Sequence, residues 1–185
     1  MSGRGLFVAV VGPSGAGKDS LIRDLAGRLR GVPTFGVVKR YVTRAADAHE
    51  DHHTLDIESF EALAQAGRFA LTWRAHGLSY GVPAEVDAEL SGGRTLVCNL
   101  SRAAVDAARR RWPDVWVVRV TASPATLAAR LARRGREAEA DRGSRLARAP
   151  LTETAPDVVI DNDGDFAEAA DRLYRLLAAR RSALP

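Results

Sequence analysis

The sequence predicts an α/β protein in which helices cover both faces of a parallel β-sheet, and three observations lead to this fold class. Short apolar segments alternate with longer amphipathic segments, as expected when each strand is followed by a helix. The first apolar segment runs directly into a glycine-rich loop. The length of 185 residues suits one domain with a sizeable core. Since such sheets bind ligands beyond the carboxyl ends of their strands, we expect the functional site there.

The glycine-rich loop is the most specific motif in the chain. Leu6–Val11 is a continuous apolar run, typical of a buried strand, and it is followed by Gly12-Pro13-Ser14-Gly15-Ala16-Gly17-Lys18. Glycines let backbone N–H groups approach phosphate oxygens, and Lys18 supplies a charge for the β- and γ-phosphates. The N-terminus of a helix predicted over Asp19–Leu29 adds partial positive charge. The motif indicates a P-loop NTPase that binds ATP through residues 12–20.

The position after Lys18 departs from the general motif, which has Ser or Thr there to bind Mg²⁺. This chain has Asp19, followed by Ser20. A carboxylate is a hard oxygen ligand, so Asp19 is a candidate Mg²⁺ ligand, directly or through water, and Ser20 is the alternative. Asp19 could also serve only the helix N-terminus, where acidic residues are favoured. The sequence leaves these interpretations open.

The composition of the chain limits which class of ligand and which cellular compartment we expect. The formal net charge is +4, and nearly all of the positive charge is arginine, since Lys18 and Lys39 are the only lysines. This suits a polyanionic ligand. Aromatic residues are few and not interleaved with arginines, so we expect a small molecule rather than nucleic acid. The single cysteine, Cys98, and the lack of a signal-peptide pattern or a membrane-length apolar run favour a cytoplasmic protein that does not enter a membrane.

The first half of the remaining chain is assigned from periodicity and capping residues. Phe35–Val42 is rich in β-branched and aromatic residues and is predicted as one strand. Ser59 is predicted as the N-cap of a helix that ends at Gly67. A short strand over Phe69–Trp73 and a loop over residues 76–81 follow. Pro83 fits the first turn of a helix that runs to about Leu90.

The second half continues the same alternation. Buried strands are predicted over Thr95–Leu100, Val115–Val120 and Val158–Asp161. Helices are predicted from Ser101 to about Arg111, from Ser123-Pro124 to Arg134, and over Phe166–Arg181. Arginines crowd the end of the middle helix and the segment beyond it, at Arg130, Arg133, Arg134, Arg136, Arg142, Arg145 and Arg148.

The arginine run has two interpretations. It could be a solvated face that pairs locally with Glu137, Glu139 and Asp141. In a chain with a phosphate-binding loop it could instead be a flap that closes over a nucleotide. Phosphoryl transfer depends on positioning and charge neutralisation, and the arginine fork matches phosphate oxygens. The loop motif favours the flap.

These motifs resemble the guanylate kinase superfamily of nucleoside-monophosphate kinases over nearly the whole chain. Five parts of this chain carry the resemblance. Gly12–Lys18 is similar to the family's phosphate loop, Thr43-Arg44 to its substrate-phosphate motif, and His76–Gly81 to its Tyr-Gly loop. Asp161-Asn162-Asp163 is similar to the segment that borders adenine, and Arg130, Arg134 and Arg145 resemble the lid arginines. The resemblance implies one domain with core segments 6–34, 92–128 and 150–185. It also implies a small acceptor-binding region at about 35–90 and an Arg-rich lid at about 129–149.

This chain differs from guanylate kinases at positions that take part in the recognition of guanine. Thr72 stands where guanylate kinases have a glutamate that reads guanine, Val82 stands where they have Thr or Ser, and Arg40 replaces a serine. Val97-Cys98-Asn99 stands in place of an acidic segment. Without a carboxylate acceptor, buried guanine N–H groups would lack partners. Arg40 suits an additional phosphate in place of a base.

A narrower resemblance is to the ribose 1,5-bisphosphate phosphokinases of phosphonate breakdown. It rests on Gly17-Lys18-Asp19-Ser20, Glu50-Asp51-His52, Trp73–Leu78 and Asn99–Arg102. It implies transfer of the ATP γ-phosphoryl group to the 1-phosphate of ribose 1,5-bisphosphate, which gives 5-phosphoribosyl 1-diphosphate (PRPP) and ADP.

The resemblance also implies roles for individual residues. Lys18, Arg130, Arg134 and Arg145 would act in catalysis, and residues 12–20 with Asn162 would bind ATP. Arg40, Arg44, His76 and Tyr80 would bind the acceptor, and Asp19 or Ser20 would hold Mg²⁺. The alternatives are a guanylate kinase acting on GMP and a kinase-like binding module without activity. The oligomeric state is left open, a homodimer included.

Overall fold

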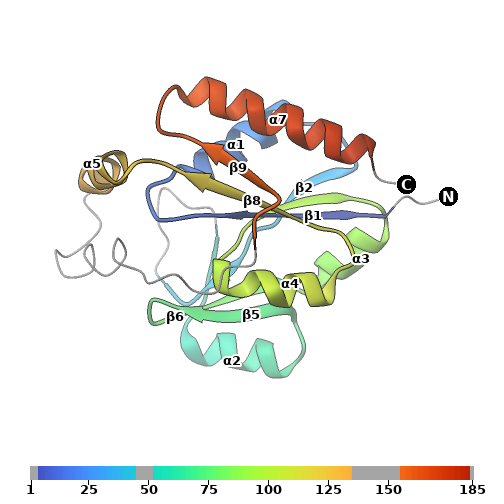
Figure 1. The fold of residues 1–185 in the computed structure, drawn as a ribbon. Helices are drawn as coiled ribbons and strands as arrows, with labels where there is room; N and C mark the ends of the chain where they lie inside the picture. Colours follow the sequence, from blue (N-terminus) through green and yellow to red (C-terminus); the bar gives the residue numbers. More distant parts are fainter. Residues whose placement is uncertain (1–3, 45–51, 135–154, 184–185) are drawn as a thin grey trace.

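A five-stranded parallel sheet forms the centre of the molecule (Figure 1). The computed structural model describes residues 4–44, 52–134 and 155–183. Every pairing in this sheet is parallel, which confirms the predicted fold class. The strands lie in the order β2 (Phe35–Val37), β7 (Thr95–Asn99), β1 (Leu6–Val11), β8 (Val115–Thr121) and β9 (Val158–Asp161).

Helices cover both faces of this sheet (Figure 1). One face carries α1 (Lys18–Arg28) and α7 (Phe166–Ser182), and the other carries α3 (Glu85–Ser91), the 3₁₀ turn η1 (Arg102–Ala104) and α4 (Val105–Arg111). Leu6, Val8 and Val10 pack in the first core, whereas Phe7, Ala9 and Val11 pack in the second. Because both of its faces are buried, β1 reads as a continuous apolar run rather than an alternating one.

A second, smaller sheet lies below the first (Figure 1). Its strands lie in the order β4 (His53–Thr54), β3 (Tyr41–Val42), β6 (Leu78–Pro83) and β5 (Phe69–Ala75), and α2 (Ile57–Gln65) covers its outer side. The pairings of β6 are antiparallel, and β3 pairs with β4 in parallel. The sequence predicted only a parallel sheet, so this second sheet is a finding of the structure.

The prediction of a single strand over residues 35–42 is wrong, and the difference matters for the site. It forms β2, which pairs with β7 in the main sheet, and β3, which joins the second sheet. Val38 N still bonds to Val97 O at 2.8 Å, after which Lys39 and Arg40 connect the sheets. The periodicity of the segment could not show this, because the residues of both strands favour β-structure and the division depends on pairing with distant strands.

The prediction of a loop over residues 76–81 is also wrong, because most of these residues belong to β6. Ala75 pairs with Leu78, so His76-Gly77 is a two-residue hairpin turn. Both residues have positive φ, 56° and 70°, as the tight turn of a twisted hairpin requires.

The N-cap of α2 is Asp56 rather than the predicted Ser59, and the Asp56 carboxylate accepts from the Ser59 N–H at 2.7 Å.

The last strand and the flanking helices agree with the prediction within a few residues. β9 is as predicted, and α5 (Pro124–Arg134) and α7 begin and end close to the predicted bounds. Most of the expected lid lies outside the described residues, together with Arg145. No helix in the described ranges is apolar and long enough to cross a bilayer.

Candidate active site

A cleft opens at the carboxyl ends of the central strands, between the main sheet and the second sheet. The phosphate loop and the segment after β7 contribute one side, while the flanks of β3 and the β5–β6 hairpin contribute the other. The lining residues are Gly12, Pro13, Ser14, Lys18, Arg40, Arg44, Trp73, Ala75, His76, Tyr80, Asn99, Leu100, Ser101 and Arg102. The position is the one expected for a ligand of a parallel sheet.

The phosphate loop is held by close backbone contacts. A Cβ on Gly12, whose φ is 143°, would lie 2.2 Å from Val120 O, and a Cβ on Gly17, whose φ is 91°, would lie 2.3 Å from the Asn162 side-chain nitrogen. These positions accept only glycine. Lys18 Nζ donates to Pro13 O at 2.9 Å, which bends the side chain back across the loop.

The start of α1 suits an anion. Gly17 is its N-cap residue, and no described side chain caps the helix by a hydrogen bond. The first amides of this 11-residue helix therefore keep the polarity that favours phosphate. The loop and helix start thus fit the phosphates of ATP.

Asn162 lies behind the loop rather than in the cleft. It is 2% exposed, and its Nδ2 donates to Ala16 O at 2.7 Å. Its backbone N–H donates to Thr121 O at 2.8 Å, which extends the β8–β9 pairing by one residue. The side chain therefore joins the end of the last strand to the phosphate loop.

Asp19 is oriented by a partner from another strand. Asn99 Nδ2 donates to Asp19 Oδ1 at 2.7 Å, which connects the end of β7 to the first turn of α1. The two residues are 80 positions apart in the sequence. Ser20 is the next residue of the helix and is half-buried. A carboxylate and a hydroxyl are oxygen donors of the kind that Mg²⁺ accepts, so this pair fits the cation.

Arg130 reaches the loop from α5. Its guanidinium donates to Asn162 O at 2.8 Å and to Gly15 O at 3.4 Å. The structure therefore brings one of the three predicted lid arginines against the phosphate loop. Arg134 is the last residue of α5, and its side chain lies outside the described part of the structure, as does the whole of Arg145.

The predicted acceptor residues lie together on the side of the second sheet. Arg40 is 8% exposed, and its guanidinium carbon lies 5.6 Å from the centre of the Tyr80 ring. Tyr80 also stacks on Trp73, with ring centres 5.2 Å apart and planes 6° apart. Arg44 and His76 complete this side of the cleft. The Tyr80 ring, itself stacked on Trp73, thus lies against the buried Arg40 guanidinium.

The backbone around Arg44 is fastened to the hairpin. Thr43 N–H donates to Ser79 O at 3.1 Å, and Thr43 Oγ1 accepts from Ser79 N–H at 2.9 Å. The Thr43-Arg44 motif and the Tyr80 segment are thereby held in register. This reciprocal pair fixes the direction in which the chain carries Arg44 into the cleft.

The cleft is strongly cationic. It is lined by Lys18, Arg40, Arg44 and Arg102, and none of its described lining residues is acidic. Cys98 of β7 precedes the lining residue Asn99, and burial raises the pKa of its thiol to about 12 despite the opposing effect of Arg40. The thiol is therefore neutral and does not offset the positive charge.

The sequence assigned no individual role to three of the lining residues, Trp73, Asn99 and Arg102, which appear there only as parts of longer motifs. The rule that ligands bind beyond the carboxyl ends of parallel strands would have pointed to Asn99 and Arg102, since both lie at or just after the end of the strand predicted over Thr95–Leu100. Nothing in the sequence showed that Trp73 stacks on Tyr80, because the hairpin that pairs them was not predicted.

The phosphate loop at the end of the central strand, the basic cleft and the second sheet together define a P-loop kinase of the guanylate kinase type. Among solved structures, a guanylate kinase from Anaplasma phagocytophilum superposes with a TM-score of 0.67 at 22% identity, covering 97% of this chain and 88% of that one. An unliganded sugar kinase from a Janibacter species gives a TM-score of 0.52 at 18% identity, with 96% of each chain covered. These structures confirm the predicted fold.

Curated relatives identify the family. Ribose 1,5-bisphosphate phosphokinase PhnN from Acidiphilium cryptum is 48% identical over 176 residues, covering 95% of this chain and 94% of the relative. The proteins of the same name from Rhizobium etli and Methylobacterium radiotolerans are 44% and 45% identical, with at least 90% of both sequences covered. No protein-family model matches the chain. The chain belongs to the PhnN ribose 1,5-bisphosphate phosphokinase family, and it is an enzyme of the kinase class.

Proposed function

We propose that this protein transfers the γ-phosphoryl group of ATP to the 1-phosphate of ribose 1,5-bisphosphate, giving PRPP and ADP. The observation that carries the proposal is the cleft beside the phosphate loop, which is lined by four cationic side chains and, among its described residues, by no acidic one. A guanine reader would need a carboxylate to accept from the base, and the amide of Asn99, which lines the cleft, is hydrogen-bonded to Asp19. A sugar bisphosphate instead needs positive charge at two ends. The names of the curated relatives agree with this choice.

The donor side uses the loop and its surroundings. The backbone of Gly12–Gly17 and the start of α1 hold the ATP phosphates, with Lys18 released from Pro13 to reach the β- and γ-phosphates. Asp19 or Ser20 holds Mg²⁺, and Asn99 orients the carboxylate. When bound, Mg²⁺ neutralises phosphate charge. Asn162 contributes from behind, by keeping the loop in shape.

The acceptor side positions a phosphate nucleophile. Arg40, Arg44, His76 and Tyr80 hold the acceptor, so that an oxygen of its 1-phosphate faces the γ-phosphorus. A new P–O bond forms as the bond between the γ-phosphorus and the β–γ bridging oxygen breaks, and ADP leaves. A phosphate monoester is already anionic at neutral pH, so no strong general base is needed.

Charge on the transferring group is neutralised by arginines of the lid region. Arg130 is already beside the loop, and Arg134 and Arg145 are proposed to join it when residues 129–149 close over ATP. In this scheme the second sheet is the acceptor-binding region. Closure would exclude water and so prevent hydrolysis of ATP. We place the reaction in the cytoplasm, in phosphonate breakdown.

The test is a coupled ADP-release assay with ribose 1,5-bisphosphate and GMP run side by side, and with PRPP identified by mass. The bisphosphate should give a kcat/KM at least about a hundredfold above that of GMP, because none of the described lining residues carries a carboxylate that could accept from guanine. Lys18→Met should lower kcat by roughly a thousandfold while the melting temperature stays close to that of the wild type. Preference for GMP, or an active Lys18→Met enzyme, would refute the proposal.

A further inference from the structure

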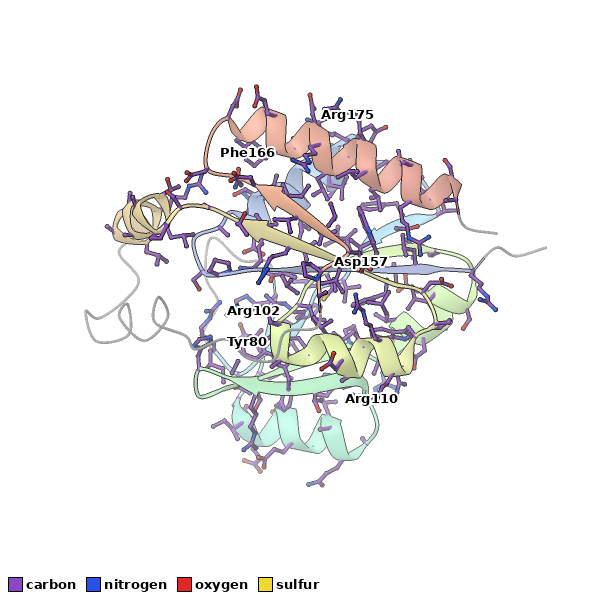
Figure 2. All side chains as sticks on the ribbon, in the orientation of Figure 1. Tyr80, Arg102, Arg110, Asp157, Phe166 and Arg175 are labelled. Atoms are coloured by element: carbon purple, nitrogen blue, oxygen red, sulfur yellow. The ribbon has the colours of Figure 1, made fainter. Side chains whose placement is uncertain are left out.

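Arg102 is a cleft residue to which the sequence assigned no role. It is the first residue of η1, directly after the segment Asn99–Ser101 that leaves β7. Figure 2 shows Arg102 above Tyr80, and both line the same cleft. The side chain is half-buried. It therefore brings a positive charge into the cleft from a segment unrelated to the other acceptor arginines.

The fold fixes where this charge comes from. Leu100 N–H donates to Val10 O at 2.9 Å, so the chain runs beside β1 until just before η1, and η1 then contacts β5 of the second sheet. Arg40 and Arg44 instead flank β3, inside the second sheet. Arg102 thus approaches the cleft from the main sheet, beside the wall made by Trp73 and Ala75.

The number of cationic side chains that line the cleft suits two anionic groups on the acceptor. A phosphate monoester carries about −1.5 to −2 at neutral pH, and one or two arginine forks satisfy its oxygens. Lys18 belongs to the donor phosphates. Arg40, Arg44 and Arg102 then exceed what one acceptor phosphate needs, and the third of them lies on a different element. A second phosphate, separated from the first by a sugar, is the group that such an arrangement matches.

We propose that Arg102 binds the non-reacting 5-phosphate of the acceptor and is thereby a specificity-determining residue. The inference rests on the proposed function, which places the 1-phosphate next to the γ-phosphate. Binding of the remote phosphate by the main sheet draws the acceptor across the cleft, so that one ligand contacts both sheets. A monophosphate acceptor lacks this connection.

The test compares Arg102→Gln and Arg102→Lys with Arg110→Gln, an exposed arginine of α4 outside the cleft. Acceptors are ribose 1,5-bisphosphate and ribose 1-phosphate, which lacks the remote phosphate. Arg102→Gln should lower kcat/KM about tenfold to a hundredfold with the bisphosphate, mainly through KM, and less than about threefold with ribose 1-phosphate. Arg102→Lys should retain part of the effect, and Arg110→Gln should change neither acceptor.

A binding measurement checks the same assignment without turnover. Ribose 5-phosphate carries only the remote phosphate, so its affinity, measured by calorimetry, should fall in Arg102→Gln by the same factor as kcat/KM with the bisphosphate. Equal losses with both acceptors, or unchanged affinity for ribose 5-phosphate, would overturn the inference. Failure of the wild type to use the bisphosphate would instead refute the proposed function, while the calorimetry would still decide whether Arg102 binds a sugar phosphate.

Discussion

Two asparagine side chains position the phosphate loop and the start of the following helix through hydrogen bonds. Asn99 holds the Asp19 carboxylate from the end of β7, and Asn162 holds Ala16 O from the end of β9. Neither carries charge, so neither alters the electrostatics of the cleft. Their amide groups provide directed hydrogen bonds that fix where the charged groups stand, which is the function a positioning residue needs.

Gly17→Ala should damage ATP binding without unfolding the protein. Its φ of 91° strains an alanine, and the new Cβ would lie 2.3 Å from the Asn162 nitrogen, so the loop must shift. We expect at least a tenfold loss of ATP affinity by calorimetry, roughly the effect of one lost charge-assisted bond. Gly27→Ala is the matched control, because its Cβ meets nothing within 4 Å. That change should raise stability by about 0.5–1 kcal/mol and leave ATP affinity unchanged.

Cys98 should be chemically silent in the folded protein. It is fully buried, and burial raises the pKa of its thiol to about 12, so thiolate is scarce at neutral pH. A chromogenic disulfide reagent at pH 8 should release less than one equivalent of thiolate over hours, and one full equivalent in denaturing urea. Rapid labelling of the native protein would contradict the burial of this residue.

At the scale of elements, the hairpin of β5 and β6 organises the acceptor side. It stacks Trp73 on Tyr80, and it exposes His76 at the mouth of the cleft. The turn consists of only His76 and Gly77, both with positive φ. A small change of turn conformation would therefore be passed directly to two acceptor residues.

Substitutions of the two turn residues should distinguish an effect on stability from an effect on acceptor binding. Gly77→Ala should cost about 1 kcal/mol of stability, because alanine is strained at a φ of 70° although its Cβ meets no atom within 4 Å. His76→Asn should leave the melting temperature within about 2 °C, since asparagine tolerates this conformation, and it should raise the KM for the acceptor. An unchanged KM would mean that the imidazole does not contact the acceptor.

The elements that the sequence predicted well are those whose signals are local. The β1–loop–α1 unit and the strand Val158–Asp161 carry their own periodicity or motif, and both were confirmed. The division of residues 35–42 between two sheets depends on pairing with distant β7 and β6, which no local pattern encodes. Likewise, Lys18, Arg44 and Tyr80 were predicted from motifs and line the cleft, while their roles stay predictions. The Asn99–Asp19 bond required the assembled fold.

At the scale of the whole molecule, a buried indole and an ion pair connect the helices beneath the main sheet. Asp87 of α3 accepts from Trp112 Nε1 at 2.8 Å and from Arg111 Nε at 3.0 Å. Trp112 packs on Phe7 of the central strand, with ring centres 4.2 Å apart. The charge of one carboxylate thus influences the packing of two helices on the sheet.

Asp87→Asn should reduce stability at pH 7 and lose its effect in acid. The Arg111 guanidinium, assisted by the Trp112 indole, holds the pKa of the Asp87 carboxyl below its usual value, so its contribution is present above the unfolded pKa and disappears as pH falls through the folded pKa. Since the side chain is 39% exposed, solvent screening limits the effect to roughly 0.5–1 kcal/mol. Urea unfolding at pH 7 and pH 2 should show a smaller difference between the variant and the wild type at pH 2 than at pH 7.

The contact between Asn162 and Ala16 has a consequence for how the enzyme is made. Ribosomes synthesise Ala16 and the rest of the loop well before Asn162, which lies 146 positions after Ala16. A nascent chain therefore exposes the nucleotide-binding segment long before that segment can acquire its working shape. Nucleotide capture therefore depends on a contact that can form only after Asn162 has been synthesised.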